Sequence, residues 1–275
     1  MTTRVGFVGL GNIGKPMALR LAGTAGIDLQ VYDVAPDPVA ELVAAGAVAV
    51  DSVAALDVDV VCVMVRDDDQ VRSVAADVPL DTVLVVHSTV APGTPAELAA
   101  AGHRILDAPV SGGAMGAADG TLAVMVGGTD EAFAAAKPVL DALGSLVVHA
   151  GPIGAGTKFK LARNMLHFIA FTATTEAQRL AEAAGLDLKA LGQVVRHTDA
   201  ITGGPGAIMH RETAAPLDPD DFWHGVFTNV TSLGVKDLGF AIDLAHQLGV
   251  DVPLAELAID RLGPGLGLSA TEGHD

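Results

Sequence analysis

A glycine-rich segment near the start of the chain constrains the fold more than any other feature. Residues 4–9 are typical of a buried strand and run directly into Gly9-Leu10-Gly11-Asn12-Ile13-Gly14, after which a helical pattern begins. In this spacing the first glycine permits a tight turn, the second lets the backbone approach a pyrophosphate, and the third lets the helix pack on the strand. A second strand pattern ends at Asp33, where an acid is suited to bind ribose hydroxyls. Together these elements predict a dinucleotide-binding site.

The residue at position 33 also bears on the choice of cofactor. A carboxylate there repels the 2′-phosphate of NADP, and Val34 rather than an arginine follows it. The segment therefore favours NAD and leaves NADP possible. The residues of this segment that we expect to contact the cofactor are Gly9, Gly11, Asn12, Ile13, Gly14 and Asp33.

Strand and helix patterns alternate through the N-terminal half of the chain. Valine-rich strands separated by alanine-rich helices are typical of a parallel sheet with helices on both faces. After the first two strands, the pattern predicts strands at 47–50, 58–65, 82–87, 104–108, 121–127 and 145–148, and helices at 36–45, from about 67, at 93–101 and at 130–142. Ligands of such sheets bind at the carboxyl ends of the strands, so we expect a site near residues 64–66, 87–89 and 107–111.

Residues 109–120 are almost all small and predict a loop after the strand at 104–108. Successive backbone N–H groups of Ser111, Gly112 and Gly113 can form an anion-binding nest that suits a carboxylate. A plain flexible loop is the alternative interpretation.

The pattern changes after residue 153, where strand signals end. Helices are predicted at 157–184, 187–197, 203–211, 225–248 and 253–262. We therefore expect an α/β Rossmann-type domain with a mainly parallel sheet at 1–155, followed by an all-α C-terminal domain at 156–275, joined through a long interdomain helix. That helix is apolar over much of its surface, which is typical of packing by a second subunit. We expect a homodimer or homotetramer formed through the helical domain.

The composition excludes several classes of function. Half of the 275 residues are hydrophobic, which is ample for a core, and a net charge of −17 argues against nucleic acid or an anionic membrane as a partner. The single cysteine, Cys62, lies in an apolar run as a core residue and excludes an intrachain disulfide or a cysteine-rich zinc site. We find no uncharged apolar stretch long enough to span a bilayer, and we expect a cytoplasmic protein.

Histidines and acidic residues give no metal-site pattern. His103, His149 and His210 have no partners at the spacing of metal ligands. The acidic run at 67–69 stands at the start of a predicted helix, where negative charge caps the N-terminus. We therefore expect no bound metal.

The segment from Gly154 to Asn164 joins the two predicted domains. Lys160 and Asn164 are spaced so that a helix places both side chains on one face, while Arg163 points elsewhere. A lysine and an amide beside a glycine turn can hold a polar substrate and move a proton. An exposed lysine with an asparagine one turn later is the alternative.

Four motifs in order resemble the β-hydroxyacid dehydrogenases of the 3-hydroxyisobutyrate dehydrogenase group, in the 6-phosphogluconate dehydrogenase-like superfamily. The motifs are 6–18, Asp107-Ala108-Pro109-Val110-Ser111-Gly112-Gly113, 154–164 and Lys236-Asp237-Leu238, and the resemblance covers essentially the whole chain. It implies that Lys160 is the catalytic lysine and that Asn164, with the segment Ser111 to Gly113, binds the substrate. It also implies that Val65, Arg66, Gln70 and Thr89 contact the cofactor, and that Lys236 closes over cofactor and substrate.

Three positions depart from the family's pattern. Arg163 replaces the first of two consecutive asparagines, Arg66 stands where a proline is common, and His87 stands where an acid usually precedes the Ser-Thr pair. None of these changes removes a catalytic group. Arg66 and His87 leave the cofactor preference less certain, because a cation at 66 can tolerate a phosphate.

The resemblance implies NAD-dependent, reversible oxidation of a small β-hydroxy acid to its semialdehyde, with Lys160 as general acid and base. The alternatives are an NADPH-dependent aldehyde, glyoxylate or imine reductase and a catalytically inactive NAD-binding protein. Retention of Lys160 argues against imine reduction, because imine reductases of this architecture generally replace that lysine. Residues near Phe222, Trp223 and Phe227 are candidates for substrate specificity.

Overall fold

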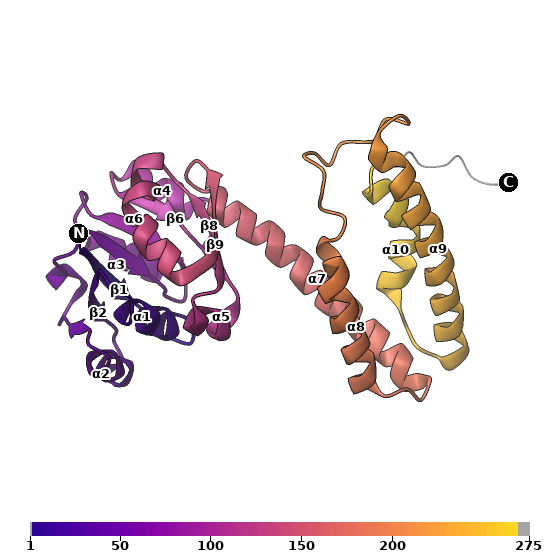
Figure 1. Ribbon diagram of the computed structural model, residues 1–275, viewed down its shortest axis with the longest axis horizontal. Helices are drawn as coiled ribbons and strands as arrows, with labels where there is room; N and C mark the ends of the chain where they lie inside the picture. Colours follow the sequence, from indigo (N-terminus) through magenta and orange to yellow (C-terminus); the bar gives the residue numbers. More distant parts are fainter. Residues whose placement is uncertain (1, 269–275) are drawn as a thin grey trace. The chain divides into compact units, whose positions relative to one another are not determined.

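The computed structural model describes residues 2–268. The chain consists of two compact units, Met1–Asn164 and Met165–Asp275 (Figure 1). The first unit contains the β-sheet and the second is helical. The division falls inside one helix, α7 (Ala155–Ala183), which begins at the predicted boundary near residue 155. The separate roles that we assign to the two regions stay a prediction.

One sheet forms the centre of the first unit, in the strand order β3-β2-β1-β4-β5-β6-β8-β7, with β9 paired to β8. The strands from β1 to β6 run parallel to one another, β8 runs antiparallel to β6 and β7, and β9 is parallel to β8. The predicted Rossmann-type fold with a mainly parallel sheet is therefore confirmed. The strands are β1 (Thr3–Val8), β2 (Ile27–Tyr32), β3 (Val48–Ala49), β4 (Val60–Val63), β5 (Val83–Val86), β6 (Arg104–Asp107), β7 (Val110–Ser111), β8 (Leu122–Gly127) and β9 (Gly144–Gly151).

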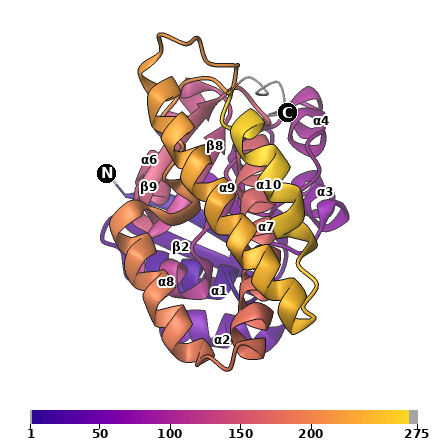
Figure 2. The ribbon, with the colours of Figure 1, turned by 90° about the vertical axis from the view of Figure 1, so that its right-hand side faces the viewer.

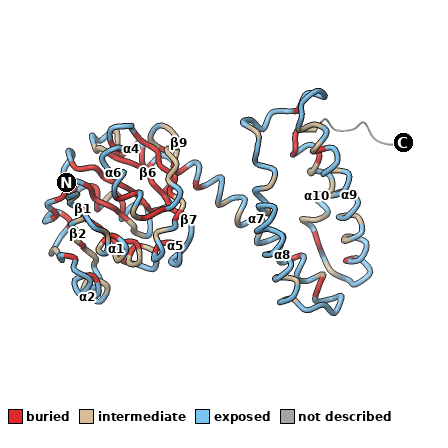
Figure 3. Tube along the Cα trace, viewed as in Figure 1, coloured by how far each residue is buried: buried red, intermediate tan, exposed pale blue. Residues whose placement is uncertain are grey.

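Helices cover both faces of this sheet because its central strands are apolar on both sides. Phe7 of β1 packs with Met17 of α1 and Leu140 of α6 on one face, whereas Val8 packs with Val71 and Leu84 on the other. Each of these buried side chains contributes roughly 1.5–3 kcal/mol by leaving water, and buried residues follow the strands (Figure 3). The helices are α1 (Gly14–Ala22), α2 (Pro36–Ala44), α3 (Asp68–Ala76), α4 (Thr94–Ala100), α5 (Gly113–Asp119) and α6 (Asp130–Leu143), with a 3-10 turn η1 at Val53–Ala55.

Two predicted segments differ from the structure. The predicted loop at 109–120 instead contains strand β7 and helix α5, because Ala117 is buried in the core and fixes the alanine-rich segment against it. The predicted helix at 203–211 is reduced to the 3-10 turn η2 (Gly204–Gly206), because Gly203 and Gly204 adopt positive φ angles of 89° and 54°.

The second unit contains the rest of α7, α8 (Leu188–Thr202), α9 (Phe222–Leu248) and α10 (Pro253–Gly265). Helices α9 and α10 run side by side (Figure 2), and Phe227 of α9 packs with Leu217 and Leu266 in a small cluster. Glu176 of α7 accepts the backbone N–H groups of Leu254 and Ala255 at the start of α10. Among the described residues, no helix is long and apolar enough to cross a membrane.

Candidate active site

The glycine segment after β1 combines two kinds of constraint. Gly9 has a φ of +94°, and a Cβ on Gly9 would lie 2.3 Å from Met64 O. A Cβ on Gly14 would lie 2.0 Å from Gly9 O. Both positions therefore exclude a side chain because the protein itself fills the space. A Cβ on Gly11 would meet no protein atom within 4 Å. Gly11 faces open space, which is where a ligand can approach the backbone.

A groove of about 830 Å³ lies along this segment and the neighbouring strand ends. Its volume is within the range of about 300–1,000 Å³ that is typical of ligand sites. The predicted cofactor residues that line it are Gly9, Gly11, Asn12, Ile13, Gly14, Asp33, Val65, Arg66 and Gln70. Thr89 is not among the lining residues. Four further residues line the groove without a local pattern that indicates them, because their positions depend on how the elements pack: Tyr32, Ser52, Ser73 and Asp77.

Asp33 links the end of β2 to the glycine turn. Its Oδ2 accepts the N–H of Leu10 at 2.5 Å, and its Oδ1 accepts the N–H of Ala35 at 2.8 Å. The carboxylate therefore connects the glycine turn to the segment after β2, while each oxygen keeps a further lone pair for a ribose hydroxyl. The open Gly11, the groove and this acid fit a dinucleotide.

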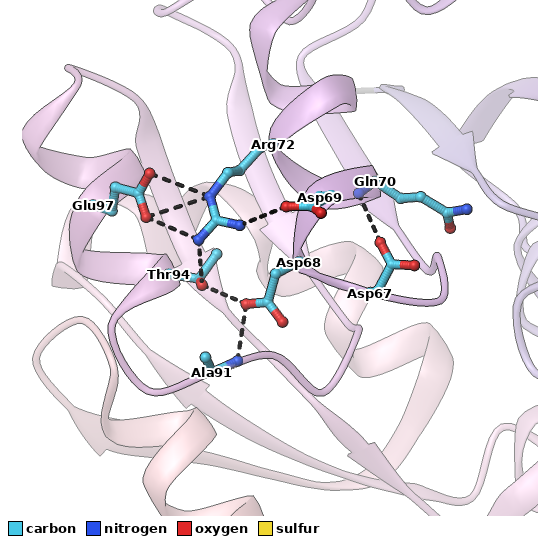
Figure 4. A network of polar contacts seen from close by, with 8 residues as sticks. All are labelled: Asp67, Asp68, Asp69, Gln70, Arg72, Ala91, Thr94 and Glu97. Carbon is cyan, nitrogen blue, oxygen red and sulfur yellow. Dashed lines mark hydrogen bonds and ion pairs between the residues drawn. The ribbon is translucent and has the colours of Figure 1, made fainter.

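Helix α3, whose residues Gln70 and Ser73 line the groove, is held in place by a network of polar contacts (Figure 4). Asp67 caps α3 by accepting the N–H of Gln70 at 2.9 Å, and the Gln70 side chain accepts the N–H of Arg66 at 3.0 Å. Asp68 accepts hydrogen bonds from the hydroxyl of Thr94 and the N–H of Ala91. The capping interpretation of this acidic run is thus confirmed.

Arg72 adds a second link between α3 and α4. Its guanidinium lies 3.0 Å from the Glu97 carboxylate and 3.1 Å from that of Asp69. These contacts keep α3, and with it Gln70, against the start of α4. In the part of the chain that the structure describes, no group of three or more histidine, cysteine or acidic residues is arranged to hold a metal.

Ser88, in the strand end 87–89 that was expected near the site, links the ends of β4 and β5. Its hydroxyl accepts the N–H of Val65 and donates to the carbonyl of Val65, both at 2.8 Å. The adjacent His87 is buried and donates from Nδ1 to the carbonyl of Ala108 at 2.8 Å. Burial lowers the pKa of His87 to about 4, so this histidine is neutral at physiological pH.

Lys160 is buried, with 8% of its surface exposed. Its Nζ donates to the carbonyl of Val110 at 2.6 Å and to the hydroxyl of Ser111 at 2.7 Å. Burial, and secondly the positive charge of Arg163, lowers the pKa of the ammonium to about 8. The alternative of an exposed, solvated lysine is therefore wrong.

Arg163 and Asn164 lie next to this lysine on α7. Arg163 donates from Nη1 to Asn164 Oδ1 at 3.2 Å. Arg163, which was expected to point elsewhere on the helix, has a side chain long enough to reach Asn164 along the helix surface. A guanidinium has only donors, so it faces the oxygen of the Asn164 amide and leaves Nδ2 to donate elsewhere.

The remaining predicted residues are placed as follows. Gly112 and Gly113, with φ angles of +136° and +65°, directly follow Ser111 and lead into α5. Lys236 lies on α9 in the second unit and is largely exposed, with its Nζ 3.2 Å from Asp237 Oδ1. Phe227 is buried in the cluster of the second unit, whereas Phe222 is exposed. Their roles stay predictions.

Asp107, at the end of β6, is completely buried. Its carboxylate accepts the backbone N–H groups of Gly154 and Thr157 at 2.7 and 2.6 Å. The motif that begins at Asp107 was recognised, but this contact joins residues 47 and 50 positions apart, so no local spacing indicates it.

The fold and the groove define a two-part NAD(P)-binding oxidoreductase. Residues 4–151 match the family model described as the NAD binding domain of 6-phosphogluconate dehydrogenase. Residues 154–262 match the model described as NAD-binding of NADP-dependent 3-hydroxyisobutyrate dehydrogenase. The chain belongs to the β-hydroxyacid dehydrogenase family, in its 3-hydroxyisobutyrate dehydrogenase group.

Three known proteins illustrate the similarity. The crystal structure of a putative oxidoreductase from Mycobacterium avium 104 has a TM-score of 0.93 and 46% identity, covering 98% of this chain and 100% of that one. The NAD-dependent L-serine dehydrogenase of Pseudomonas aeruginosa is 36% identical, over 93% of this chain and 90% of its own. A structure titled Mycobacterium tuberculosis 3-hydroxyisobutyrate dehydrogenase with L-serine has a TM-score of 0.66 and 33% identity, covering 96% and 94% of the two chains.

Proposed function

We propose that the protein interconverts a small β-hydroxy acid of the 3-hydroxyisobutyrate type and its semialdehyde, with NAD as cofactor and Lys160 as general acid and base. The observation that carries the proposal is the buried Lys160 ammonium, hydrogen-bonded to Val110 O and Ser111 Oγ. L-Serine belongs to the same substrate class, because it also carries a hydroxyl on the carbon next to the one bearing the carboxylate. The names of the two relatives that mention L-serine support its inclusion.

The chemistry requires a hydride acceptor and a base. When bound, NAD supplies the hydride acceptor. The reference pKa of a lysine, roughly 10.4, is too high for a base at neutral pH, but that of Lys160 is lowered to about 8. In oxidation the neutral amine takes the hydroxyl proton, and in reduction the ammonium returns a proton to the carbonyl oxygen.

The neighbouring groups orient the lysine and the substrate. Val110 O and Ser111 Oγ accept two of the three ammonium hydrogens, which leaves one position of Nζ for the substrate hydroxyl. The N–H groups of Ser111, Gly112 and Gly113 are suited to the carboxylate. Asn164 Nδ2 is available to donate to the substrate because Oδ1 already accepts from Arg163.

NAD is favoured over NADP on the grounds of charge. Asp33 lines the groove where a 2′-phosphate would add negative charge. Arg66 also lines the groove and is the residue that would offset such a phosphate. NAD and NADP should therefore be assayed in parallel with each substrate.

A substrate panel with a matched pair of lysine variants tests the proposal. 3-Hydroxyisobutyrate, L-serine, 3-hydroxypropionate and glycerate are assayed with both cofactors. Lys160→Ala is expected to lose roughly 100- to 10,000-fold in kcat, the usual contribution of a general acid–base group, while NADH still binds. Lys158→Ala removes an exposed lysine two residues earlier and should leave turnover unchanged.

Three results would contradict the proposal. If Lys160→Ala keeps most of its turnover on every substrate that the wild type uses, Lys160 is not the acid–base group. If the wild type binds NADH but oxidises no hydroxy acid and reduces no semialdehyde, the protein is an inactive NAD-binding protein and not a dehydrogenase. Turnover of an imine in place of the acids would favour imine reduction.

A further inference from the structure

The buried carboxylate of Asp107 lies at the start of the helix that carries Lys160. Asp107 is completely buried at the end of β6, and its two oxygens accept the N–H groups of Gly154 and Thr157. Since α7 begins at Ala155, these are N–H groups at the helix N-terminus, which have no partner within the helix. A residue from a distant strand thus caps α7.

The charge of this cap suits its position. Aligned peptide dipoles place partial positive charge at a helix N-terminus, where a carboxylate is stabilised. Hydrogen bonds to an ionised acceptor are also shorter and stronger than neutral ones, which agrees with distances of 2.6 and 2.7 Å. The contact therefore holds the first turn of α7 firmly.

The backbones around Asp107 and the first turn of α7 approach one another without an intervening side chain. A Cβ on Gly156 would lie 2.3 Å from Met125 O and 2.4 Å from Asp107 O. A Cβ on Gly127 would lie 2.4 Å from Asp107 Oδ1 and 2.8 Å from the nitrogen of Ala155. The start of α7 therefore packs directly on the backbones of β6 and β8.

The segment that begins with Asp107 also holds Lys160, about one turn further along α7. Val110 O and Ser111 Oγ accept from the lysine Nζ. Residues 107–111 thus contact α7 at its first turn and at its catalytic side chain. Any rotation of the first turn about the helix axis would move Nζ relative to both acceptors.

We propose that Asp107 is a positioning residue, whose carboxylate sets the first turn of α7 so that Lys160 Nζ lies between Val110 O and Ser111 Oγ. This inference rests on the proposed function for its effect on turnover. It assigns no contact between Asp107 and the substrate. Its effect is transmitted through the helix backbone to Lys160.

Asp107→Asn tests the inference with nearly unchanged volume. The amide keeps one acceptor oxygen and turns a donor toward the second N–H, so one contact is lost. We expect kcat to fall at least tenfold, with NADH affinity within twofold of the wild type because the groove residues are untouched. Asp187→Asn is the matched control: Asp187 caps α8 by accepting two backbone N–H groups, and this variant should keep the wild-type kcat.

A second measurement reports on Lys160 without requiring turnover. The rate of acetic anhydride labelling of Lys160, followed by mass spectrometry across pH, gives the pKa of its amine. Loosening the first turn exposes Nζ to water, so Asp107→Asn should raise this pKa from about 8 toward the ordinary value of 10.5. A merely structural cap would lower the melting temperature and leave the labelling profile unchanged.

Combined variants distinguish a failure of the positioning role of Asp107 from a failure of the proposed function. In a Lys160→Ala background, Asp107→Asn should cause no further loss of residual turnover, because both act through one group. Wild-type values of kcat and Lys160 pKa in Asp107→Asn would overturn the positioning role. If instead no hydroxy acid is turned over but the Lys160 pKa still shifts, the proposed function fails and the positioning role stands. Asp107→Ser, which keeps one acceptor oxygen, is read in the same way if the asparagine variant does not fold.

Discussion

At the scale of single residues, the proposed acid–base role of Lys160 predicts opposite pH dependences for oxidation and for reduction. Oxidation needs the neutral amine, so kcat/KM for the hydroxy acid should rise through pH 8 and level off above it. Reduction needs the ammonium, so kcat/KM for the semialdehyde should fall over the same interval. Initial rates from pH 6 to 10 in both directions check this, and a flat oxidative profile would contradict it.

Arg163 departs from the family's pattern and has a testable effect on Lys160. Its charge disfavours the ammonium form, so Arg163→Asn should raise the pKa of Lys160. The rise should be well below one pKa unit, because Arg163 is exposed and solvent screens its charge. The oxidative limb of the pH profile should move to higher pH by the same amount. Arg196→Asn, at an exposed arginine of α8, is the control and should leave the limb in place.

At the scale of elements, two glycines of the turn after β1 meet different requirements. Gly11 leaves space for the ligand, and Gly14 lets α1 pack closely on the turn. Gly11→Ala places a methyl group where no protein atom lies within 4 Å, so the melting temperature should hold while NADH affinity falls about tenfold or more, because the methyl occupies the ligand's space. Gly14→Ala places its methyl 2.0 Å from Gly9 O. It should destabilise the fold by about 1–3 kcal/mol or more.

Fluorescence titration with NADH and thermal unfolding read out the two glycine variants. Equal NADH affinity in Gly11→Ala and the wild type would mean that the cofactor does not approach this backbone. An unchanged melting temperature in Gly14→Ala would mean that α1 can move away from β1 without cost.

The elements also show which features a sequence can indicate. Runs of valine bounded by glycine are local features of the sequence, so β1 to β6 and β8 were predicted within a few residues of their observed bounds. Strand β7 lies in the segment that was predicted as a loop. α5 was missed, because its residues Gly113 to Asp119 are stabilised by packing on α1 rather than by an amphipathic pattern. The spacing of Lys160 and Asn164 indicated a shared helix face. The contacts of Lys160 with Ser111, and of Asp107 with α7, depend on tertiary structure and have no local signal.

At the scale of the whole molecule, the second unit has little core of its own. Its small cluster contains Leu217, Phe227 and Leu266, while Phe168, Phe171 and Phe240 are 60%, 54% and 67% exposed. Apolar surface of this kind is typical of a protein–protein interface. We therefore expect the protein to self-associate through the helical unit, as a homodimer or homotetramer.

Light scattering after size exclusion should give a mass of at least twice the 27.8 kDa of one chain. Phe240→Ser should shift the population toward the single-chain mass, because it removes exposed apolar area from α9. Leu80→Ser, at an exposed leucine of the first unit, is the control and should not change the mass. A wild-type mass of one chain at micromolar concentration would contradict the expectation.

The continuity of α7 across the two units has a consequence for protein engineering. A chimera that takes its helical unit from another family member is joined within or just before this helix, and the position of the joint decides which parent supplies Lys160. A junction after Asn164 keeps Asp107, Lys160 and their shared contacts in one parent, whereas a junction before Gly154 divides them between two. A crossover that follows residue 164 and preserves the helical register therefore exchanges the helical unit while Lys160 keeps its own contacts.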